Sequence, residues 1–318
     1  MTKYIIRRLL LFIPTLVLVT AMVFATLRIM PGDVAALIVT GGGESGFNEQ
    51  AYQQVRQELH LDEPIVMQYV RWVFDALGGD FGNSYWSETS VRDELVTRLP
   101  VTLELAIAAP VLGLLLGVPL GVISAVRQNT TVDYLARAVS LTGLAVPHFW
   151  LGILIIIVLA NVFGWVVPLR YAELWQDPWT NIRQLFWPVI VLATGFMALL
   201  SRVTRSAMLE VLRADYIRTA RSKGLRGTVV VRRHGLRNAL LPIVTITAAQ
   251  FGGLISGTLV TEQIFNIPGM GRYFVESVFV HDFPVVQAVV LLIGVTYLTV
   301  NLVVDMAYAW IDPRIHYA

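Results

Sequence analysis

The sequence contains no cysteine and only two lysines, Lys3 and Lys223, among its 318 residues. The lack of cysteine excludes disulfide bonds, thiolate metal sites and cysteine nucleophiles. Neither lysine lies in the Gly-Lys-Ser/Thr sequence of a Walker A loop, which cradles nucleotide phosphates. Any ATP hydrolysis coupled to the function of this chain must therefore take place on another subunit.

Charged residues are also scarce, at 14% of the chain, whereas soluble domains carry about 25%. Hydrophobic residues make up 56% of the sequence, and the mean hydropathy is +0.65. The five histidines are scattered and form no His-Glu-x-x-His pair, so we expect neither a metal site nor a metalloprotease. The composition predicts a membrane protein.

Six stretches are long enough to cross a hydrocarbon core, which needs about 20 mainly apolar residues. The first follows Lys3, Arg7 and Arg8, as a secretory signal peptide would, but its apolar run is longer and no clean cleavage site follows. We therefore expect a retained anchor. The sequence predicts an all-α membrane protein with six transmembrane helices, at 9–30, 100–125, 136–163, 186–200, 239–260 and 285–310.

The charges of the connecting segments predict the orientation. Residues 31–98 carry eleven acids against four arginines, whereas 202–237 holds ten of the twenty-four basic residues. Because basic loops are retained on the cytoplasmic side, we expect 202–237 and both termini inside and 31–98 outside. An outside segment of that length should contain structure or serve a partner. Its residues 49–77 show a helical pattern broken at Pro64.

The basic segment 202–237 has an internal pattern of its own. Apolar residues recur at three- and four-residue spacing and predict one amphipathic helix that ends at Lys223-Gly224, since glycine is preferred just past a helical C-terminus. A second short helix is predicted over 229–241. Many basic loops only set topology, and that alternative stays open from composition alone. The apolar stripe consists of Ala207, Met208, Val211, Leu212, Ala214, Ile217 and Ala220.

Several polar residues interrupt the apolar spans. Glu104 and Asp305 lie near helix ends, where a carboxylate either pairs at the membrane interface or faces the bundle interior. Smaller polar residues on the third and fifth predicted spans either line a pathway or serve helix packing. The possible pathway-lining residues are Thr142, His148, Gln250, Ser256 and Thr258.

The motif DYIRTARSKG, followed after a spacer by LRNALLP, resembles the coupling loop of ABC importer permeases of the peptide and nickel transporter subfamily. The common pattern of the family is Glu-Ala-Ala, three residues and Gly; here Arg218, Thr219 and Ala220 precede Gly224 in register. The departure at Arg218 and Thr219 resembles the peptide-type permeases. Three further segments resemble this subfamily: QELHLDEPIVMQYVRWV with GGDFGNS, EQIFNIPGMGRYFVESVFVHDFPVVQ, and the closing WIDPRIHY. The second of these either caps a pathway on the outside or anchors two helices.

The resemblance implies a type I ABC importer permease fold, with an outside insertion after the first helix. We expect residues 1–94 to form the N-terminal helix and the insertion, 95–310 the transmembrane domain, and 311–318 a cytoplasmic tail. The implied coupling residues, which would contact an ATPase, are Asp215, Tyr216, Ile217, Arg218, Thr219, Ala220, Arg221, Ser222, Lys223 and Gly224.

The implied function is that of a B-type permease subunit in the bacterial inner membrane, importing dipeptides, oligopeptides or a related solute. Its implied partners are a second homologous permease, two ATPase subunits, an extracytoplasmic binding protein and membrane lipid, with no nucleic acid. The chain itself would bind no cofactor and be no enzyme, since ATP and Mg²⁺ belong to the ATPases. The alternative is an ion-gradient-driven secondary transporter, although such proteins usually show inverted repeats and acids at mid-membrane depth, which are not apparent here.

Overall fold

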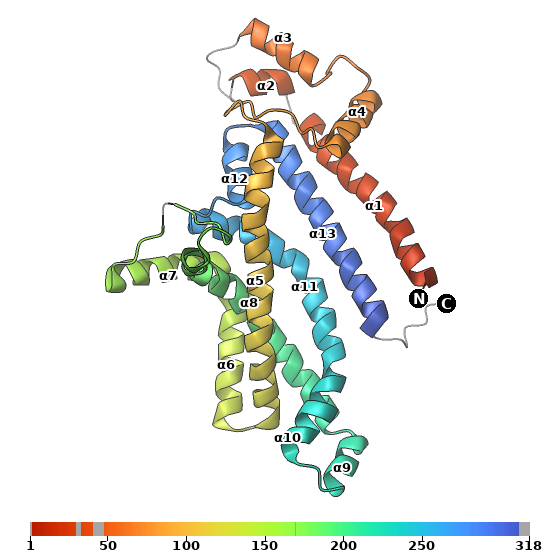
Figure 1. Cartoon of the computed structure of the whole chain (residues 1–318), viewed down its shortest axis with the longest axis vertical. Coiled ribbons are helices and arrows are strands. Elements are labelled where there is room, and N and C mark those ends of the chain that lie inside the picture. Colours follow the sequence, from red (N-terminus) through yellow and green to blue (C-terminus); the bar gives the residue numbers. More distant parts are fainter. Residues whose placement is uncertain (1, 30–32, 41–47, 169, 312–318) are drawn as a thin grey trace. The chain divides into compact units, whose positions relative to one another are not determined.

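The computed structural model describes residues 2–29, 33–40, 48–168 and 170–311. Within these ranges the chain is helical, and its only extended pairing is an isolated bridge between Asn83 and Ser90. The all-α prediction is confirmed. The chain divides into two compact units: unit 1 is Met1–Thr102 with Pro268–Ala318, and unit 2 is Leu103–Ile267. One long helix, α5 (Val91–Val126), begins in unit 1 and continues in unit 2 (Figure 1).

Unit 1 is built on two long apolar helices, α1 (Thr2–Ile29) and α13 (Phe283–Ile311), which pack side by side. Gly294 of α13 permits this approach, because a Cβ atom there would lie 2.9 Å from Val19 Cγ1. The short helix α12 (Met270–Phe279) packs on α13 near the start of α5. The core between α5, α12 and α13 consists of Val91, Leu95, Met270, Tyr273, Val285, Ala288 and Val289.

The described part of the predicted outside insertion contains three helices. These are α2 (Val34–Thr40), α3 (Glu49–Glu58) and α4 (Ile65–Gly78), so the interruption expected at Pro64 is confirmed. Hydrogen bonds join α4 to α1: Arg28 donates to Gln68 Oε1 through Nε and Nη2 at 3.0 and 2.8 Å, and the hydroxyls of Thr20 and Tyr69 lie 2.8 Å apart. The helix α4 of the insertion is therefore anchored on α1.

Unit 2 surrounds one central helix, α8 (Pro178–Leu212), on which α6 (Thr131–Ala145), α7 (His148–Phe163) and α11 (Arg237–Ile264) pack. Glycines at four-residue spacing let α5 approach the backbone of α8. A Cβ at Gly117 would lie 2.7 Å from Met197 O, and one at Gly121 would lie 2.5 Å from Ser201 O. Small residues at this spacing are typical of close helix packing in membranes. Unit 2 is completed by α9 (Asp215–Ser222), α10 (Gly227–Val229) and the π-helix η1 (Val230–Leu236).

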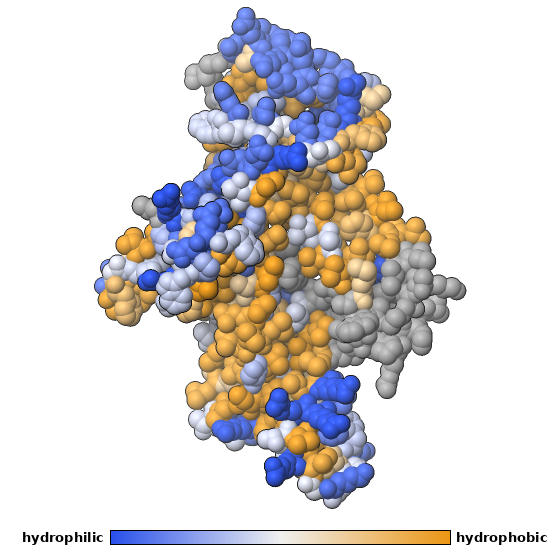
Figure 2. Space-filling model, in the orientation of Figure 1, coloured by the Kyte–Doolittle hydropathy of each residue, from blue (hydrophilic) through white to orange (hydrophobic). Residues whose placement is uncertain are grey.

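The transmembrane segments follow the predicted apolar runs with one correction. Within the described residues, α1, α5, α8 and α13 are each long and apolar enough to span a membrane, and α6 with α7 makes a fifth span if the bent pair counts as one. The predicted fifth span lies within α11, so the total of six stays a prediction. Figure 2 shows the broad apolar surface that the helices of unit 2 present.

The predicted continuous helix over 136–163 is wrong. The chain bends by 103° between α6 and α7. Pro147 has no N–H to continue the helical ladder, and its ring forces the preceding Val146 into an extended conformation with φ −85° and ψ 121°. An apolar run of sufficient length therefore conceals two helices of different direction.

Candidate functional site

The predicted amphipathic helix of the basic segment is divided into two helices. α8 ends at Leu212, Ala214 is extended with φ −68° and ψ 149°, and α9 begins at Asp215. The prediction of one helix ending at Gly224 is therefore wrong in its length. The apolar stripe is divided with it: Ala207 and Met208 pack with Ala125 and Ala239, whereas Ile217 and Ala220 of α9 pack with Val230. The break lets α9 leave the axis of α8 and bury its own apolar residues.

α9 presents one buried and one exposed face. Ile217 is fully buried and Ala220 is 7% exposed. Even the ion pair between Asp215 and Arg218 is open to solvent, with side chains 90% and 79% exposed. We call the exposed face and its end the coupling surface; it consists of Asp215, Tyr216, Arg218, Thr219, Arg221, Ser222, Lys223 and Gly224.

The end of α9 has the backbone geometry expected from its glycine. Gly224 has φ +74°, in the left-handed region that residues with a Cβ rarely adopt. Its N–H donates to Arg221 O at 2.9 Å, and the N–H of Leu225 donates to Ala220 O at 3.4 Å, which together form a Schellman motif. The predicted left-handed stop at Gly224 is confirmed.

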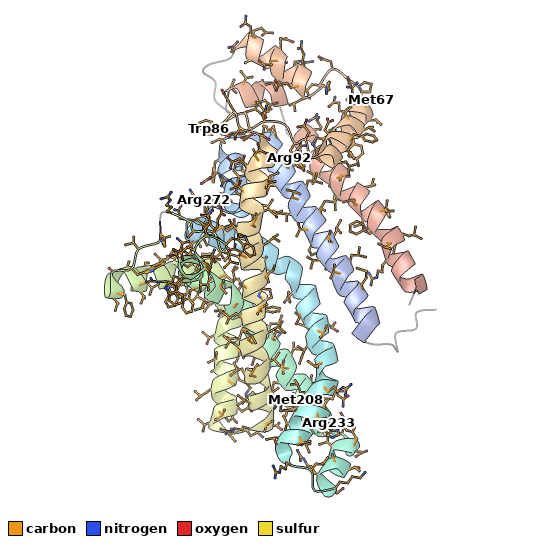
Figure 3. All side chains as sticks on the ribbon, viewed as in Figure 1. Met67, Trp86, Arg92, Met208, Arg233 and Arg272 are labelled. Atoms are coloured by element: carbon orange, nitrogen blue, oxygen red, sulfur yellow. The ribbon has the colours of Figure 1, made fainter. Side chains whose placement is uncertain are left out.

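The segment after α9 holds this helix against the rest of unit 2. The predicted second helix over 229–241 is instead a continuous run through α10, η1 and the start of α11. η1 supplies Val230, which covers Ile217 and Ala220, and the Asn238 side chain donates to Tyr216 Oη at 3.1 Å. Figure 3 labels Met208 and Arg233 at this end of unit 2. Such π-helical turns often occur at functional sites.

A buried carboxylate that the sequence analysis did not identify lies at the start of α6. Asp133 is fully buried and accepts two hydrogen bonds from Arg205, at 2.8 and 2.9 Å. It also accepts from Ser124 Oγ at 2.6 Å and from the N–H of Asn129 at 2.9 Å. We call these four residues the Asp133 cluster. It joins the end of α5, the following turn, α6 and the part of α8 that leads towards α9.

Two of the predicted pathway residues lie together. His148 and Gln250 both line a cavity of about 400 Å³ at the bend between α6 and α7. The imidazole lies over the backbone of Gly195, where a Cβ would be 2.4 Å from His148 Cε1. Thr142 is exposed on α6 and is not among the described residues lining this cavity, and Thr258 is buried. The side chain of Ser256 lies outside the described residues.

Glu104, one of the two acids predicted near helix ends, belongs to a polar cluster. It accepts hydrogen bonds from Tyr171 Oη at 2.7 Å and from Asn181 Nδ2 at 2.8 Å. Burial, followed by the hydrogen bond to Glu104, raises the pKa of the Tyr171 phenol. Because α5 begins at Val91, Glu104 lies well inside this helix, and the predicted position near a helix end is wrong. It pairs instead with residues of the loop before α8 and of the first turn of α8. The side chain of Asp305 and the closing Asp312, Pro313 and Arg314 lie outside the described residues.

Apolar helices around a central helix, with a short amphipathic helix within a basic segment, are the features of an integral membrane protein. The profile of the binding-protein-dependent transport system inner membrane component matches residues 117–317, and the profile of the N-terminal part of these membrane components matches residues 1–106. The chain belongs to this family. It is a permease subunit of a bacterial ABC importer and a multi-pass protein of the inner membrane.

Curated relatives agree with this assignment. The glutathione transport system permease protein GsiC of Escherichia coli (strain K12) and that of Shigella dysenteriae serotype 1 are each 41% identical over 317 residues, covering 100% of both chains. The relatives and the family decide against the ion-driven alternative. They also imply association with other ABC components such as ATPases and a binding protein.

Two solved structures share the fold. The MetNI methionine ABC transporter in an inward-facing conformation matches with a TM-score of 0.56 at 17% identity, covering 69% of this chain and 96% of that chain. An amino acid ABC transporter with histidines matches with a TM-score of 0.52 at 17% identity, covering 70% and 94%. At this identity the likeness concerns the fold alone.

Proposed function

We propose that the coupling surface of α9 docks into a cleft of an ATPase subunit and passes ATP-driven motion to the membrane helices. The observation that carries the proposal is the division of α9 into two faces. Ile217 and Ala220 attach the helix to Val230 of η1, while its polar and basic side chains face solvent. A helix used only to set topology would not need this attachment.

The attachment supplies a physical route for coupling. A partner shifts a conformational equilibrium only by contacting its states differently, so the docked element must move with the helices that it controls. Val230 and Asn238 hold α9 to the run that becomes α11, and Arg205 of α8 is held by Asp133 of α6. A displacement of α9 is thereby transmitted to three membrane helices of unit 2.

The substrate that we propose is a peptide or a related solute. Support comes from the relatives named for glutathione transport, which match over the full length of the chain. Together with a second homologous permease, the chain would form half of the translocation path. The cavity holding His148 and Gln250 is the best-supported part of that path, with Thr142, Ser256 and Thr258 as further candidates.

The charge pattern supports the proposed orientation, and the family supports the remaining assignments. Residues 1–94 form the first helix and outside insertion, 95–310 the transmembrane domain and 311–318 the tail, with both termini in the cytoplasm. ATP and Mg²⁺ are bound by two partner ATPases, and the solute-binding protein docks on the outside insertion.

Because the chain has no cysteine, single introduced cysteines can report on which side of the membrane a segment lies. Ser87→Cys should react with an impermeant maleimide in intact cells, and Ser222→Cys only after permeabilisation.

The decisive experiment is glutathione uptake by the reconstituted transporter. The permease pair, the ATPases and the binding protein should together drive ATP-dependent uptake, which should stop when the binding protein is omitted. The same vesicles should be tested with a dipeptide and with a nickel chelate to define the substrate class. Uptake driven by a proton or sodium gradient, without ATPases, would contradict the proposed mechanism.

A further inference from the structure

Unit 1 contains a pocket of about 360 Å³ that the proposed mechanism does not use. Its walls come from the loop before α5, the first turns of α5, α12 and the turn that follows α12. Figure 3 labels Trp86 on the first of these walls and Arg272 on α12. The residues that matter for recognition are Trp86, Glu94, Arg98, Tyr273, Glu276 and Asp282.

Tyr273 is the residue that points to an occupant. It is 8% exposed, lines the pocket, and its hydroxyl has no hydrogen-bond partner among the residues that the structure describes. Burial, followed by the nearby charges of Glu94 and Asp282, raises the pKa of Tyr273 to about 12. The hydroxyl therefore stays neutral at physiological pH. Buried hydroxyls are normally paired in native proteins, so an unpaired one beside a pocket indicates a partner that arrives from elsewhere.

The charges in the pocket define the chemistry of that partner. Three carboxylates, of Glu94, Glu276 and Asp282, line it with one arginine, Arg98. Arg98 is engaged, because its Nε lies 2.8 Å from Glu94 Oε2 and its guanidinium lies 4.4 Å from the centroid of the Tyr273 ring. Glu276 is paired as well, because its Oε1 lies 2.7 Å from Arg272 Nε. Asp282 accepts hydrogen bonds from Ser84 and from the N–H of Tyr85, but no ion pair of the described residues neutralises its charge. The remaining negative charge favours a cation with N–H donors, which would also find the Tyr273 oxygen as an acceptor.

A second cavity in unit 1 extends the negative surface. It has a volume of about 890 Å³ and shares Ser84 with the first pocket. Its lining includes Glu58, Asp75, Asp80 and Glu88, and no lysine or arginine among the described residues. Ser84 itself donates a hydrogen bond to Asp282, which fixes the wall between the two cavities. Together the cavities present a surface complementary to a basic face.

We propose that the Tyr273 pocket receives a lysine or arginine side chain of the solute-binding protein. The inference rests on the proposed function and names where docking occurs. The cation would donate to the Tyr273 oxygen and to the carboxylates, while the 74% exposed Trp86 covers it from the rim. A tyrosine and a tryptophan around a central charge are typical of residues that dominate binding energy at interfaces. The acidic second cavity would extend the contact and favour this macromolecular source over a free amine.

The test is the affinity of the complete transporter in nanodiscs for its binding protein, measured by biolayer interferometry. Tyr273→Phe should raise Kd about tenfold, the effect of losing one hydrogen bond to a charged group. Its thermal midpoint should not fall, because the variant removes an unpaired hydroxyl. Glu276→Gln should also weaken docking. Tyr69→Phe is the matched control, since its hydroxyl is paired with Thr20 within the chain, and it should leave Kd unchanged.

The possible outcomes separate this inference from the proposed function. Unchanged docking by both Tyr273→Phe and Glu276→Gln, with uptake still dependent on the binding protein, overturns the pocket alone. Loss of the second permease from the Tyr273→Phe complex also overturns it, because the pocket would then be a contact between permeases. Inhibition of uptake by lysine methyl ester without weaker docking would assign the pocket to a small cation instead. Wild-type uptake without any binding protein would overturn the proposed function itself.

Discussion

The Asp133 cluster and the coupling surface belong to the same unit but differ in how far their charged side chains are buried and paired. Asp133 is fully buried, and both of its oxygens accept hydrogen bonds from Arg205, Ser124 and Asn129. On α9, by contrast, Asp215 and Arg218 are almost entirely exposed. One region satisfies its polar groups internally, and the other leaves them available.

This difference separates two structural tasks. A buried ion pair is costly to form and more costly to break, so it fixes one relative position of the helices that it joins. Exposed ion pairs contribute little to folding and can be exchanged for contacts with a partner. The Asp133 cluster is therefore suited to keep α6 and α8 moving together. The coupling surface is suited to contact the ATPase from which the motion comes.

The largest expected effect comes from removing Asp133. Asp133→Ala leaves Arg205 without its buried partner and should lower the free energy of unfolding by about 3–5 kcal/mol. Unfolding in mixed detergent micelles, followed by circular dichroism, measures the change. Asp215→Ala is the control on the exposed side and should unfold like wild type. Equal stability of the two variants would remove the basis of the comparison.

A smaller effect is expected where α5 meets α8. Gly121→Ala places a Cβ 2.5 Å from Ser201 O, so the two helices must separate, at a cost of about 1–3 kcal/mol. The matched control is Gly227→Ala at the start of α10, where a Cβ would meet nothing within 4 Å. The same unfolding assay compares them. If Gly121→Ala is neutral, the close packing of α5 on α8 is incorrect.

The smallest effect on folding, with a distinct effect on partners, is expected at Gly224. Gly224→Ala must hold a Cβ-bearing residue at φ +74°, which costs about 1–2 kcal/mol locally. Insertion and unfolding of the permease should change little, while recovery of ATPase subunits on co-purification should fall. Gly224→Asn should restore part of the recovery, because asparagine tolerates this conformation. Full recovery with Gly224→Ala would show that the end of α9 does not need its geometry for docking.

The sequence predicted the elements that depend on local properties. Apolar runs located α5, α8 and α13, Pro64 located an interruption, and the position of Gly224 predicted its left-handed backbone. The bend at Pro147 also had a local signal, but counting apolar residues across the proline concealed it. The glycine spacing on α5 was a further signal of close packing that the hydropathy did not reveal.

The features that the sequence did not predict depend on tertiary contacts. Asp133 has the appearance of an ordinary acid in the first turn of a helix, and its partner Arg205 lies 72 residues further along the chain. The break at Ala214 involves neither proline nor glycine; it accompanies the packing of Ile217 against Val230. Tyr273 resembles any interfacial aromatic residue until its hydroxyl is seen to lack a partner within the described chain.

The most direct test of the account uses the absence of cysteine. Thr219→Cys places a single thiol on the coupling surface, and Ser87→Cys places one on the loop before α5 as a control. In the assembled transporter, a short bifunctional maleimide should link Thr219→Cys to an ATPase subunit carrying an engineered cysteine, with a yield that changes on ATP binding. Ser87→Cys should give no such product. A transport-competent complex in which no position of the coupling surface can be linked to an ATPase would contradict the account.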